Sequence, residues 1–353
     1  MVPTAQRGEA VSENPFSRIG LGRGILLWVL FFLICFGLGY ATLNRYDPRT
    51  SGIVDSVSYY EIVARGPTAR LEHVQFRVLV PFLAKPFYWL AKGRVRTWNP
   101  VFFGLLMANS LLVATTALLL ARIGHQQARD LAVALFGATI YLLNFDVTNL
   151  RLAGLIDAGE GCFLMFMVWS LFKERWWLLP LWGLLGALTK ESFVPYSTIL
   201  ASTWWLVSSR RHVSWFSRIV WVAVMVMVEF AAVMILQASL TRQVLWPWQF
   251  AATLGAGPGY VRRFVGSLVD RQSWYDFIWL LPLGVWRLKR LPRPWVVACA
   301  TTVLCPLVLS AYHNAEPGTW GRAAFSIAGP LLSLSVALLL SGPAHSLMSP
   351  DRS

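Results

Sequence analysis

The sequence predicts an all-α polytopic membrane protein with about ten transmembrane helices. Of its 353 residues, 56% are hydrophobic and only 14% are charged, and the mean hydropathy is +0.54. Apolar runs of about 14 to 24 residues recur along the chain, which is the length range of helices that cross a bilayer. The four cysteines lie inside these runs without metal-ligand spacing, so we expect them to pack as apolar side chains.

A single membrane domain, 24–341, is expected between a cytoplasmic N-terminal tail, 1–23, and a cytoplasmic C-terminal tail, 342–353. The first apolar run has 20 residues and is longer than the core of a typical signal peptide, so we expect it to be retained. The predicted spans are 24–43, 100–121, 131–147, 154–172, 176–189, 192–208, 216–239, 276–288, 294–312 and 323–341.

The charge distribution predicts that the N-terminus is cytoplasmic. The predicted inner segments carry 15 basic residues against five acids, whereas 11 of the 17 acids fall on the outer side. The net charge of +14 is therefore a topology signal spread over short loops, and it does not indicate nucleic-acid binding. Localisation in a bacterial cytoplasmic (inner) membrane follows as an expectation, with the chemistry on the outer, periplasmic face.

The segment Trp176–Val207 is a 32-residue apolar stretch interrupted only by Lys190 and Glu191. A single helix of that length would measure roughly 48 Å, well over the ~30 Å hydrocarbon core. It would also place two basic loops on opposite sides of the membrane. We therefore expect two short spans with Lys190 and Glu191 at the outer turn between them.

Two long outer segments, 44–99 and 241–275, separate the spans. In the first, Arg77–Lys92 is apolar with Arg and Lys at its ends, and it contains Pro81 and Pro86. We expect an interfacial helix pair lying on the membrane surface there. The second segment mixes Trp and Arg with a glycine-rich turn and is also expected to be interfacial.

Asp55 is the most prominent candidate residue, because it follows the first span and shares a helical face with Tyr59. A carboxylate there could act as a general base on an acceptor hydroxyl, or it could ligate a divalent cation. The alternative is a carboxylate that stabilises a helix start. Further along the same segment, Glu72, His73 and Arg77 form a second candidate group. Arg77 could clamp a phosphate or equally meet lipid headgroups.

Other ionisable residues mark the predicted outer ends of later spans. Asp157 and Glu160 share a face at the start of the fourth span, with simple helix capping as the alternative. Lys190 could face a phosphate-bearing lipid or pair with Glu191.

Three further residues complete the candidate set. Glu229 lies near the middle of the seventh span, where an acid is either functional or protonated and bonded to a neighbouring helix. In the last outer loop, His313 and Arg322 could meet an anionic substrate or be solvated. No dinucleotide fingerprint, P-loop lysine, HExxH or GxSxG motif is present.

The order of these features resembles the GT-C superfamily of membrane glycosyltransferases, which take sugars from polyprenyl-phosphate carriers. An acid and aromatic residues follow the first span, and an interfacial stretch that contains Arg and ends in Pro comes next. An acid then opens a span and is followed by an LTKES run. Finally, an Arg precedes an apolar run that ends in Pro. These matches are Asp55 with Tyr59 and Tyr60, residues 76–81, Asp157, residues 188–192, and 322–330.

The resemblance implies that Asp55 is the catalytic base or a metal-site acid. It implies that Arg77, Lys190 and Arg322 bind the lipid phosphate. The expected partners are a polyprenyl-phosphate-linked sugar donor, a glycan, lipid or protein acceptor, and membrane lipids, with no nucleic acid. The cofactor stays open as a possible divalent cation, because Asp55 has no adjacent carboxylate.

Two other function classes fit parts of the pattern. A transporter or flippase of a lipid-linked or anionic substrate would depend on Glu229 and on the break at Lys190. An outer-face glycan polymerase or ligase would depend on His313 and Arg322 more than on Asp55.

Overall fold

The structure is a computed structural model that describes residues 20–43, 55–67, 76–208, 214–242, 259–313 and 317–341. All regular secondary structure in these ranges is helical. The α-helices are α1 (Leu21–Tyr40), α2 (Ser56–Arg65), α3 (Leu79–Ala91), α4 (Pro100–Ala128), α5 (Leu131–Leu142), α6 (Asp157–Phe172), α7 (Leu179–Thr189), α8 (Phe193–Val207), α9 (Trp215–Thr241), α11 (Tyr260–Leu268), α12 (Arg271–Trp274), α13 (Leu280–Val285), α14 (Arg293–His313) and α15 (Thr319–Ala337).

Four of the described helices are long and apolar enough to cross a membrane, namely α1, α4, α9 and α14. The prediction of an all-α membrane-type chain is therefore confirmed at this level. The expected span 276–288 is not one helix. Only α13 forms there, and its six residues measure about 9 Å at ~1.5 Å per residue. It contains Pro282 and Gly284, the two residue types with the lowest helix propensity.

The break predicted in the long apolar stretch is present. Helix α7 ends at Thr189, and Lys190 is extended, with φ of −161° and ψ of 135°. A turn then leads into α8 at Phe193. The backbone therefore reverses where the two ionisable residues stand, and it leaves both side chains at one end of the bundle.

The pair of interfacial helices expected in 77–92 is instead a single helix, α3, with Pro86 inside it. Pro81 lies in the first turn, where a missing N–H leaves no intrahelical bond unmade. Helix α3 packs closely on α4 at Gly104, where a side chain would meet the Ala84 carbonyl at 2.7 Å. This packing against α4 holds the helix together across the proline.

Local signals set the ends of the central helices. The Asn99 side chain accepts a hydrogen bond from the Val101 N–H at 3.0 Å, and Pro100 opens α4. Helix α4 stops at Arg129, which has a left-handed φ of 53°. Asp130 then caps α5 by accepting from the Ala132 N–H at 2.8 Å.

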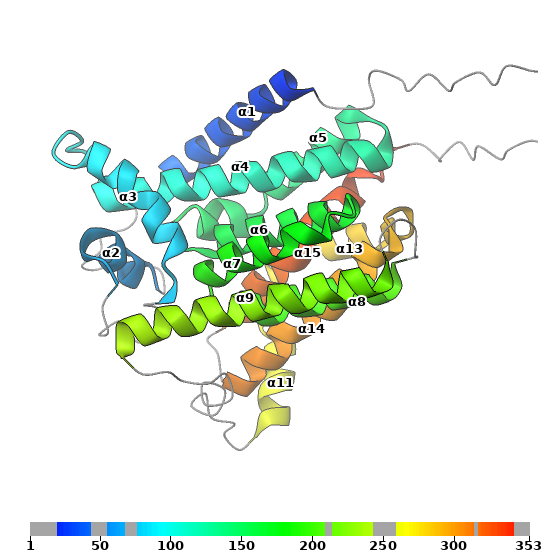
Figure 1. The fold of residues 1–353 in the computed structure, drawn as a ribbon. Helices are drawn as coiled ribbons and strands as arrows, with labels where there is room; N and C mark the ends of the chain where they lie inside the picture. Colours follow the sequence, from blue (N-terminus) through cyan, green and yellow to red (C-terminus); the bar gives the residue numbers. More distant parts are fainter. Residues whose placement is uncertain are drawn as a thin grey trace, which may run out of the picture.

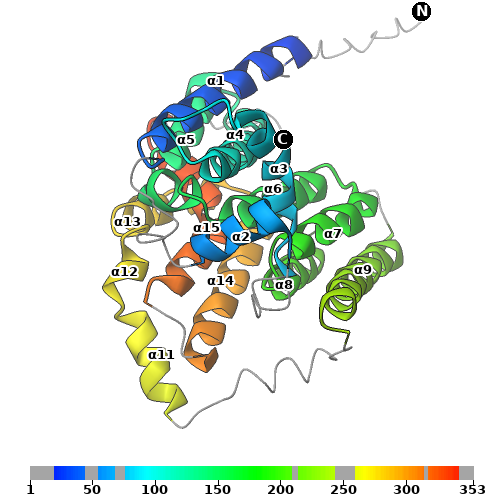
Figure 2. The ribbon, with the colours of Figure 1, turned by 90° about the vertical axis from the view of Figure 1, so that its left-hand side faces the viewer.

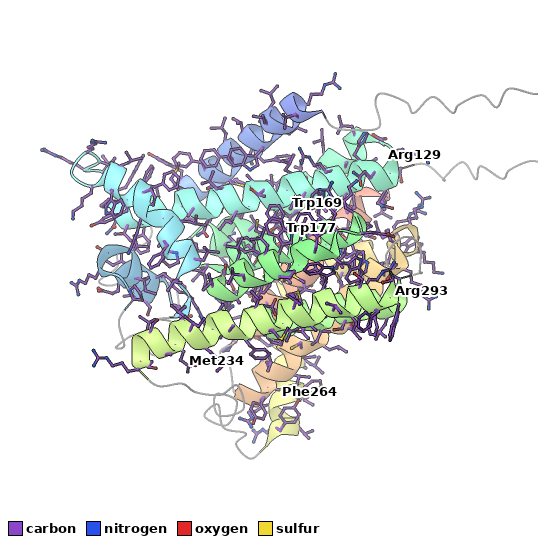
Figure 3. The ribbon with its side chains drawn as sticks, viewed as in Figure 1. Arg129, Trp169, Trp177, Met234, Phe264 and Arg293 are labelled. Carbon is purple, nitrogen blue, oxygen red and sulfur yellow. The ribbon has the colours of Figure 1, made fainter. Side chains whose placement is uncertain are left out.

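The helices form a bundle with two distinct ends (Figures 1 and 2). Helices α2 and α3 lie at one end, which is on the left in Figure 1. Arg129 and Arg293 lie at the other end (Figure 3). Helices α4, α6 and α15 are the most buried, whereas α1 and α9 expose much of their apolar surface. Cys35, Cys162 and Cys299 are buried, as expected of apolar packing residues, and Cys305 is partly buried.

Candidate functional site

Polar and charged side chains converge at the end of the bundle that carries α2 and α3. The contributing segments are the starts of α2, α3, α6 and α15 and the turn between α7 and α8. Asp55 immediately precedes α2, and Arg77 lies two residues before α3. Asp157 is the first residue of α6. Helix ends leave backbone groups unpaired, so polar side chains gather at them readily.

Arg77 is the centre of the outer network. Its Nε and Nη2 donate to the two carboxylate oxygens of Glu191, at 3.0 and 2.5 Å. Its Nη1 donates to Asp55 Oδ2 at 3.0 Å and to the Tyr59 hydroxyl at 2.9 Å. One guanidinium therefore holds two acids and a phenol.

Exposure differs across this network. The Asp55 side chain is 32% exposed and that of Arg77 only 10%. Burial raises the pKa of the Tyr59 hydroxyl above its usual range. Burial also raises the pKa of the Glu191 carboxyl, but the opposing effect of Arg77 is larger. The net result is a pKa lowered to about 2. Glu191 is therefore a fixed anion, and Asp55 is the acid that reaches the surface.

Lys190 forms a second network with α6. Its Nζ lies 2.9 Å from Asp157 Oδ1. The buried Glu160 accepts from the Ser192 hydroxyl at 2.9 Å and from the Ser326 hydroxyl at 3.2 Å. Burial lowers the pKa of the Lys190 ammonium, but Asp157 and Glu160 raise it above its usual value. Lys190 is therefore charged.

The two networks meet through adjacent residues. Lys190 is extended, and successive side chains of an extended backbone point to opposite sides. Lys190 accordingly binds Asp157 on α6, while Glu191 binds Arg77 next to α3. The α7–α8 turn thus couples α6 to the segment before α3.

A third layer lies beneath, around Arg151 at the end of a π-helix, Val147–Arg151. Arg151 and Asp146 are fully buried and form an ion pair. The Arg151 Nη1 donates to the Asp157 carbonyl at 2.9 Å, and its Nη2 donates to the Ser326 hydroxyl at 2.9 Å. Arg151 therefore ties the start of α6 to α15.

Arg322, on the first turns of α15, is half-buried. Within the described part of the chain its side chain has no ion pair or hydrogen bond. Arg77 differs, because its donors bond Glu191, Asp55 and Tyr59.

Seven of the residues singled out from the sequence lie in these networks, namely Asp55, Tyr59, Arg77, Asp157, Glu160, Lys190 and Glu191. Tyr60 lies apart, with its ring 5.7 Å from that of Phe102. Glu72 and His73 lie outside the described residues, as does the side chain of His313.

Sequence reasoning gave no role to Arg151, Asp146 or Ser326. The only signal for them was an Asp and an Arg five residues apart between two apolar runs. Among the described residues, no group of three or more His, Cys, Asp or Glu is arranged to hold a metal ion. The observed partners of Asp55 are Arg77 and Tyr59.

The fold and the site together define an all-α protein with membrane-type helices and a charged cluster at one end of the bundle. Comparison with protein-family models, curated proteins and solved structures finds no match in any of the three.

Proposed function

We propose that the protein is a membrane glycosyltransferase with about ten spans. It would transfer a sugar from a polyprenyl-phosphate donor to an envelope glycan, lipid or protein. The observation that carries the proposal is the pairing of roles at one end of the bundle. Asp55 is a surface-reaching carboxylate fixed by Arg77, and Arg322 is a cation without an ion pair in the described chain. The positive-inside charge bias supports placing this end on the outer, periplasmic face of the bacterial cytoplasmic membrane.

The proposed reaction uses these two residues in complementary roles. Asp55 accepts the proton of the acceptor hydroxyl, whose oxygen forms a bond to the anomeric carbon. The bond between that carbon and the donor phosphate oxygen breaks, and polyprenyl phosphate leaves with the electron pair. Arg322 stabilises the charge on the leaving phosphate. Lys190, whose ammonium is paired with Asp157, lies at the α7–α8 turn of the same cluster.

Arg77 takes a different part in this proposal from the phosphate ligand expected from the sequence. Its Nε, Nη1 and Nη2 already donate to Glu191, Asp55 and Tyr59. It is a positioning residue that fixes the Asp55 carboxylate. Tyr59 supports the same carboxylate from the next turn of α2.

The test is mass spectrometry of envelope glycans and lipid-linked intermediates in a deletion strain complemented with wild type, Asp55→Asn or Glu61→Gln. Glu61 is the control, because it lies on the same helix and forms an i,i+4 pair with the exposed Arg65. We expect the deletion to lose one sugar and accumulate the unmodified acceptor. Wild type and Glu61→Gln restore the sugar, and Asp55→Asn does not. Full restoration by Asp55→Asn refutes the role of Asp55.

A transporter of a lipid-linked or anionic substrate is the second candidate, and Glu229 is the observation that favours it. Glu229 is fully buried in α9, and neither carboxylate oxygen has a hydrogen-bond partner among the residues that the structure describes. If the protein is a transporter, the deletion strain complemented with Glu229→Gln does not export the substrate. The same strain complemented with Asp55→Asn exports it normally. If the protein is a polymerase or ligase, the strain with Arg322→Gln makes short glycans. The strain with Asp55→Asn makes glycans of normal length.

A further inference from the structure

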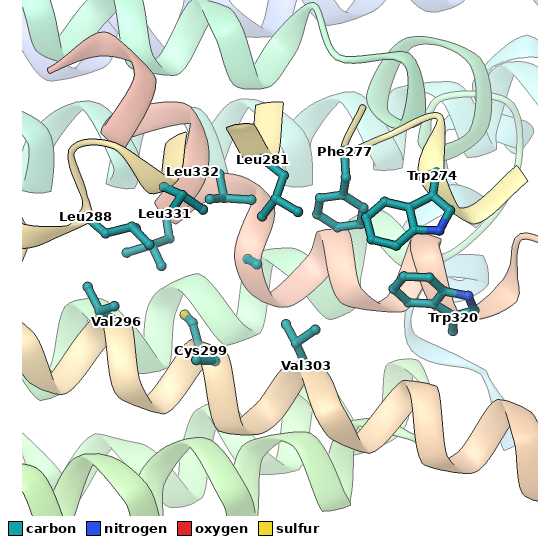
Figure 4. Close-up of a pocket in the computed structure, with 13 residues that line it drawn as sticks. Trp274, Phe277, Leu281, Leu288, Val296, Cys299, Val303, Trp320, Leu331 and Leu332 are labelled. Atoms are coloured by element: carbon teal, nitrogen blue, oxygen red, sulfur yellow. The ribbon is translucent and has the colours of Figure 1, made fainter. Parts of the chain in front are cut away.

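An apolar cavity of about 220 Å³ lies between α12–α13, α14 and α15 (Figure 4). Trp274 and Trp320 line one end, and Leu288 and Val296 line the other. All 13 lining residues are apolar or aromatic, apart from the thiol of Cys299.

The few polar atoms of the lining are already bonded elsewhere. The indole N–H groups of Trp274 and Trp320 donate to the carbonyls of Leu268 and Ser267, both at 2.6 Å. The Cys299 thiol donates to the Ile327 carbonyl at 3.4 Å. A water molecule needs two to four polar partners, and this cavity offers none. Its natural occupant is a hydrocarbon chain.

The cavity borders surface that is itself apolar. Val285, one of its lining residues, is 51% exposed, and its neighbour Trp286 is 77% exposed. The α13 segment therefore presents apolar side chains outward beside the cavity. A lipid in the surrounding bilayer can place part of a chain there without crossing a polar surface.

Two basic residues flank the Leu288 end. Arg287 and Lys289 are the immediate neighbours of Leu288, and neither forms an ion pair in the described chain. The Arg287 Nε is buried, and no described residue forms a hydrogen bond with it. This end of the cavity faces the same end of the bundle as Arg293, where the adjacent α14 begins. An anionic headgroup would complement these charges at the membrane surface.

The cavity is separate from the charged cluster. Both involve α15, but at about 100° per residue Trp320 and Leu331 lie on one face of that helix and Arg322 and Ser326 on the other. The contacts agree, because Trp320 and Leu331 line the cavity while Ser326 binds Glu160 and Arg151.

We propose that the cavity binds part of one acyl chain of an anionic phospholipid and that Arg287 and Lys289 bind its phosphate. The site stands independently of the glycosyltransferase proposal, since none of its residues belongs to the charged cluster.

The test uses full-length protein in phosphatidylcholine vesicles that contain a minor fraction of a phospholipid with a photoactivatable acyl chain. The probe carries either a phosphatidylglycerol or a phosphatidylcholine headgroup, and peptide mass spectrometry locates the cross-links. We expect the anionic probe to label the cavity segments of α13, α14 and α15 at least about fivefold more than the neutral probe. Equal labelling by the two probes, or labelling spread evenly over the lipid-facing helices, overturns the proposal.

Two variants test the two halves of the site. Ala328→Phe fills the cavity and is expected to remove its labelling. The control Leu304→Phe lies on α14, is 58% exposed and leaves labelling unchanged. The double variant Arg287→Gln/Lys289→Gln removes both charges without changing the cavity lining, and it is expected to remove the preference for the anionic probe. Its control, Arg23→Gln/Arg129→Gln, neutralises two exposed charges outside the cavity and retains the preference. Retained preference after loss of Arg287 and Lys289 overturns their role.

Discussion

The Arg77 guanidinium donates two hydrogen bonds to the Glu191 carboxylate, at 3.0 and 2.5 Å, although 114 residues separate the two in sequence. The contact fastens the segment before α3 to the turn between α7 and α8. Because the third arm of the guanidinium holds Asp55, the position of the candidate base depends on this pair. Arginine suits the task, since its planar fork can bind two groups at fixed angles.

We expect Arg77→Lys to impair the protein although it keeps the charge. An ammonium cannot reproduce the two-pronged contact with Glu191 and reach Asp55 as well. We expect a loss of about 1–3 kcal/mol of stability, seen as a lower thermal midpoint in detergent, and reduced complementation in the glycan assay.

Arg65→Lys is the matched control for Arg77→Lys. Arg65 is 76% exposed and pairs with Glu61 within α2, so the substitution should change neither readout. Equal thermal midpoints for Arg77→Lys and wild type would show that the fork is dispensable.

Glu191 predicts a defined loss of stability in acid. Its pKa is lowered from 4.5 to about 2 in the folded protein, because Arg77 outweighs the effect of burial. The unfolded chain therefore binds a proton at Glu191 that the folded chain does not, at pH values between these limits. The stabilisation is present above the unfolded pKa and is lost as the pH falls through 4.5 toward 2. Its upper limit is about 3 kcal/mol.

The measurement is the thermal midpoint at a series of pH values for wild type and Glu191→Gln. Other carboxyls titrate in both proteins, so the difference between the two curves isolates Glu191. We expect this difference to be largest near neutral pH and to shrink in acid. Parallel curves would contradict the lowered pKa.

The convergence of Asp55, Arg77, Asp157 and Lys190 was largely predictable. Asp157 and Lys190 stand at predicted outer ends of spans, and Asp55 and Arg77 lie in the predicted outer segment 44–99, so all four were expected on one side. Hydropathy and charge bias therefore predict on which side of the bundle these residues lie. Their positions relative to the spans predict which residues lie there. The break at Lys190 followed from two observations: one 32-residue helix is too long for the hydrocarbon core, and it would place two basic loops on opposite sides of the membrane.

The partners of these residues could not be predicted in the same way. Arg151 and Ser326 are 175 residues apart, and their contact depends on how α15 packs on α6. The π-helix that aims Arg151 inward has no periodicity that an apolar pattern would reveal. Likewise, the prolines suggested two helices in 77–92, but packing on α4 outweighed that local tendency and produced α3.

Lys190 and Asp157 are expected to be energetically coupled. Their ion pair is 2.9 Å long, with side chains only 17% and 9% exposed. Lys190→Met leaves Asp157 without its partner, and Asp157→Asn leaves Lys190 without its own, so each should cost about 3 kcal/mol. The double variant should cost at least about 1 kcal/mol less than the sum of the two. Thermal midpoints of the four proteins measure the coupling, and strict additivity would exclude it.

Substitution of Arg322 should weaken binding of the sugar donor and leave folding largely unaffected. Its guanidinium has no hydrogen bond or ion pair within the described residues, so Arg322→Gln removes no internal ion pair. We expect the thermal midpoint to stay close to wild type. The KM for a polyprenyl-phosphate sugar should rise about tenfold, the scale of one hydrogen-bonded phosphate charge.

Arg96→Gln provides the control for Arg322→Gln, because Arg96 follows α3 at the same end of the bundle and is exposed. If a general field of positive charge attracts the donor, the two variants raise KM alike. If Arg322 contacts the phosphate, only Arg322→Gln raises KM. Added salt then reduces the difference in KM between Arg322→Gln and wild type only slightly, because a contact shielded from water is weakly screened. An unchanged KM in Arg322→Gln would remove Arg322 from the donor site and leave Lys190 as the candidate phosphate ligand.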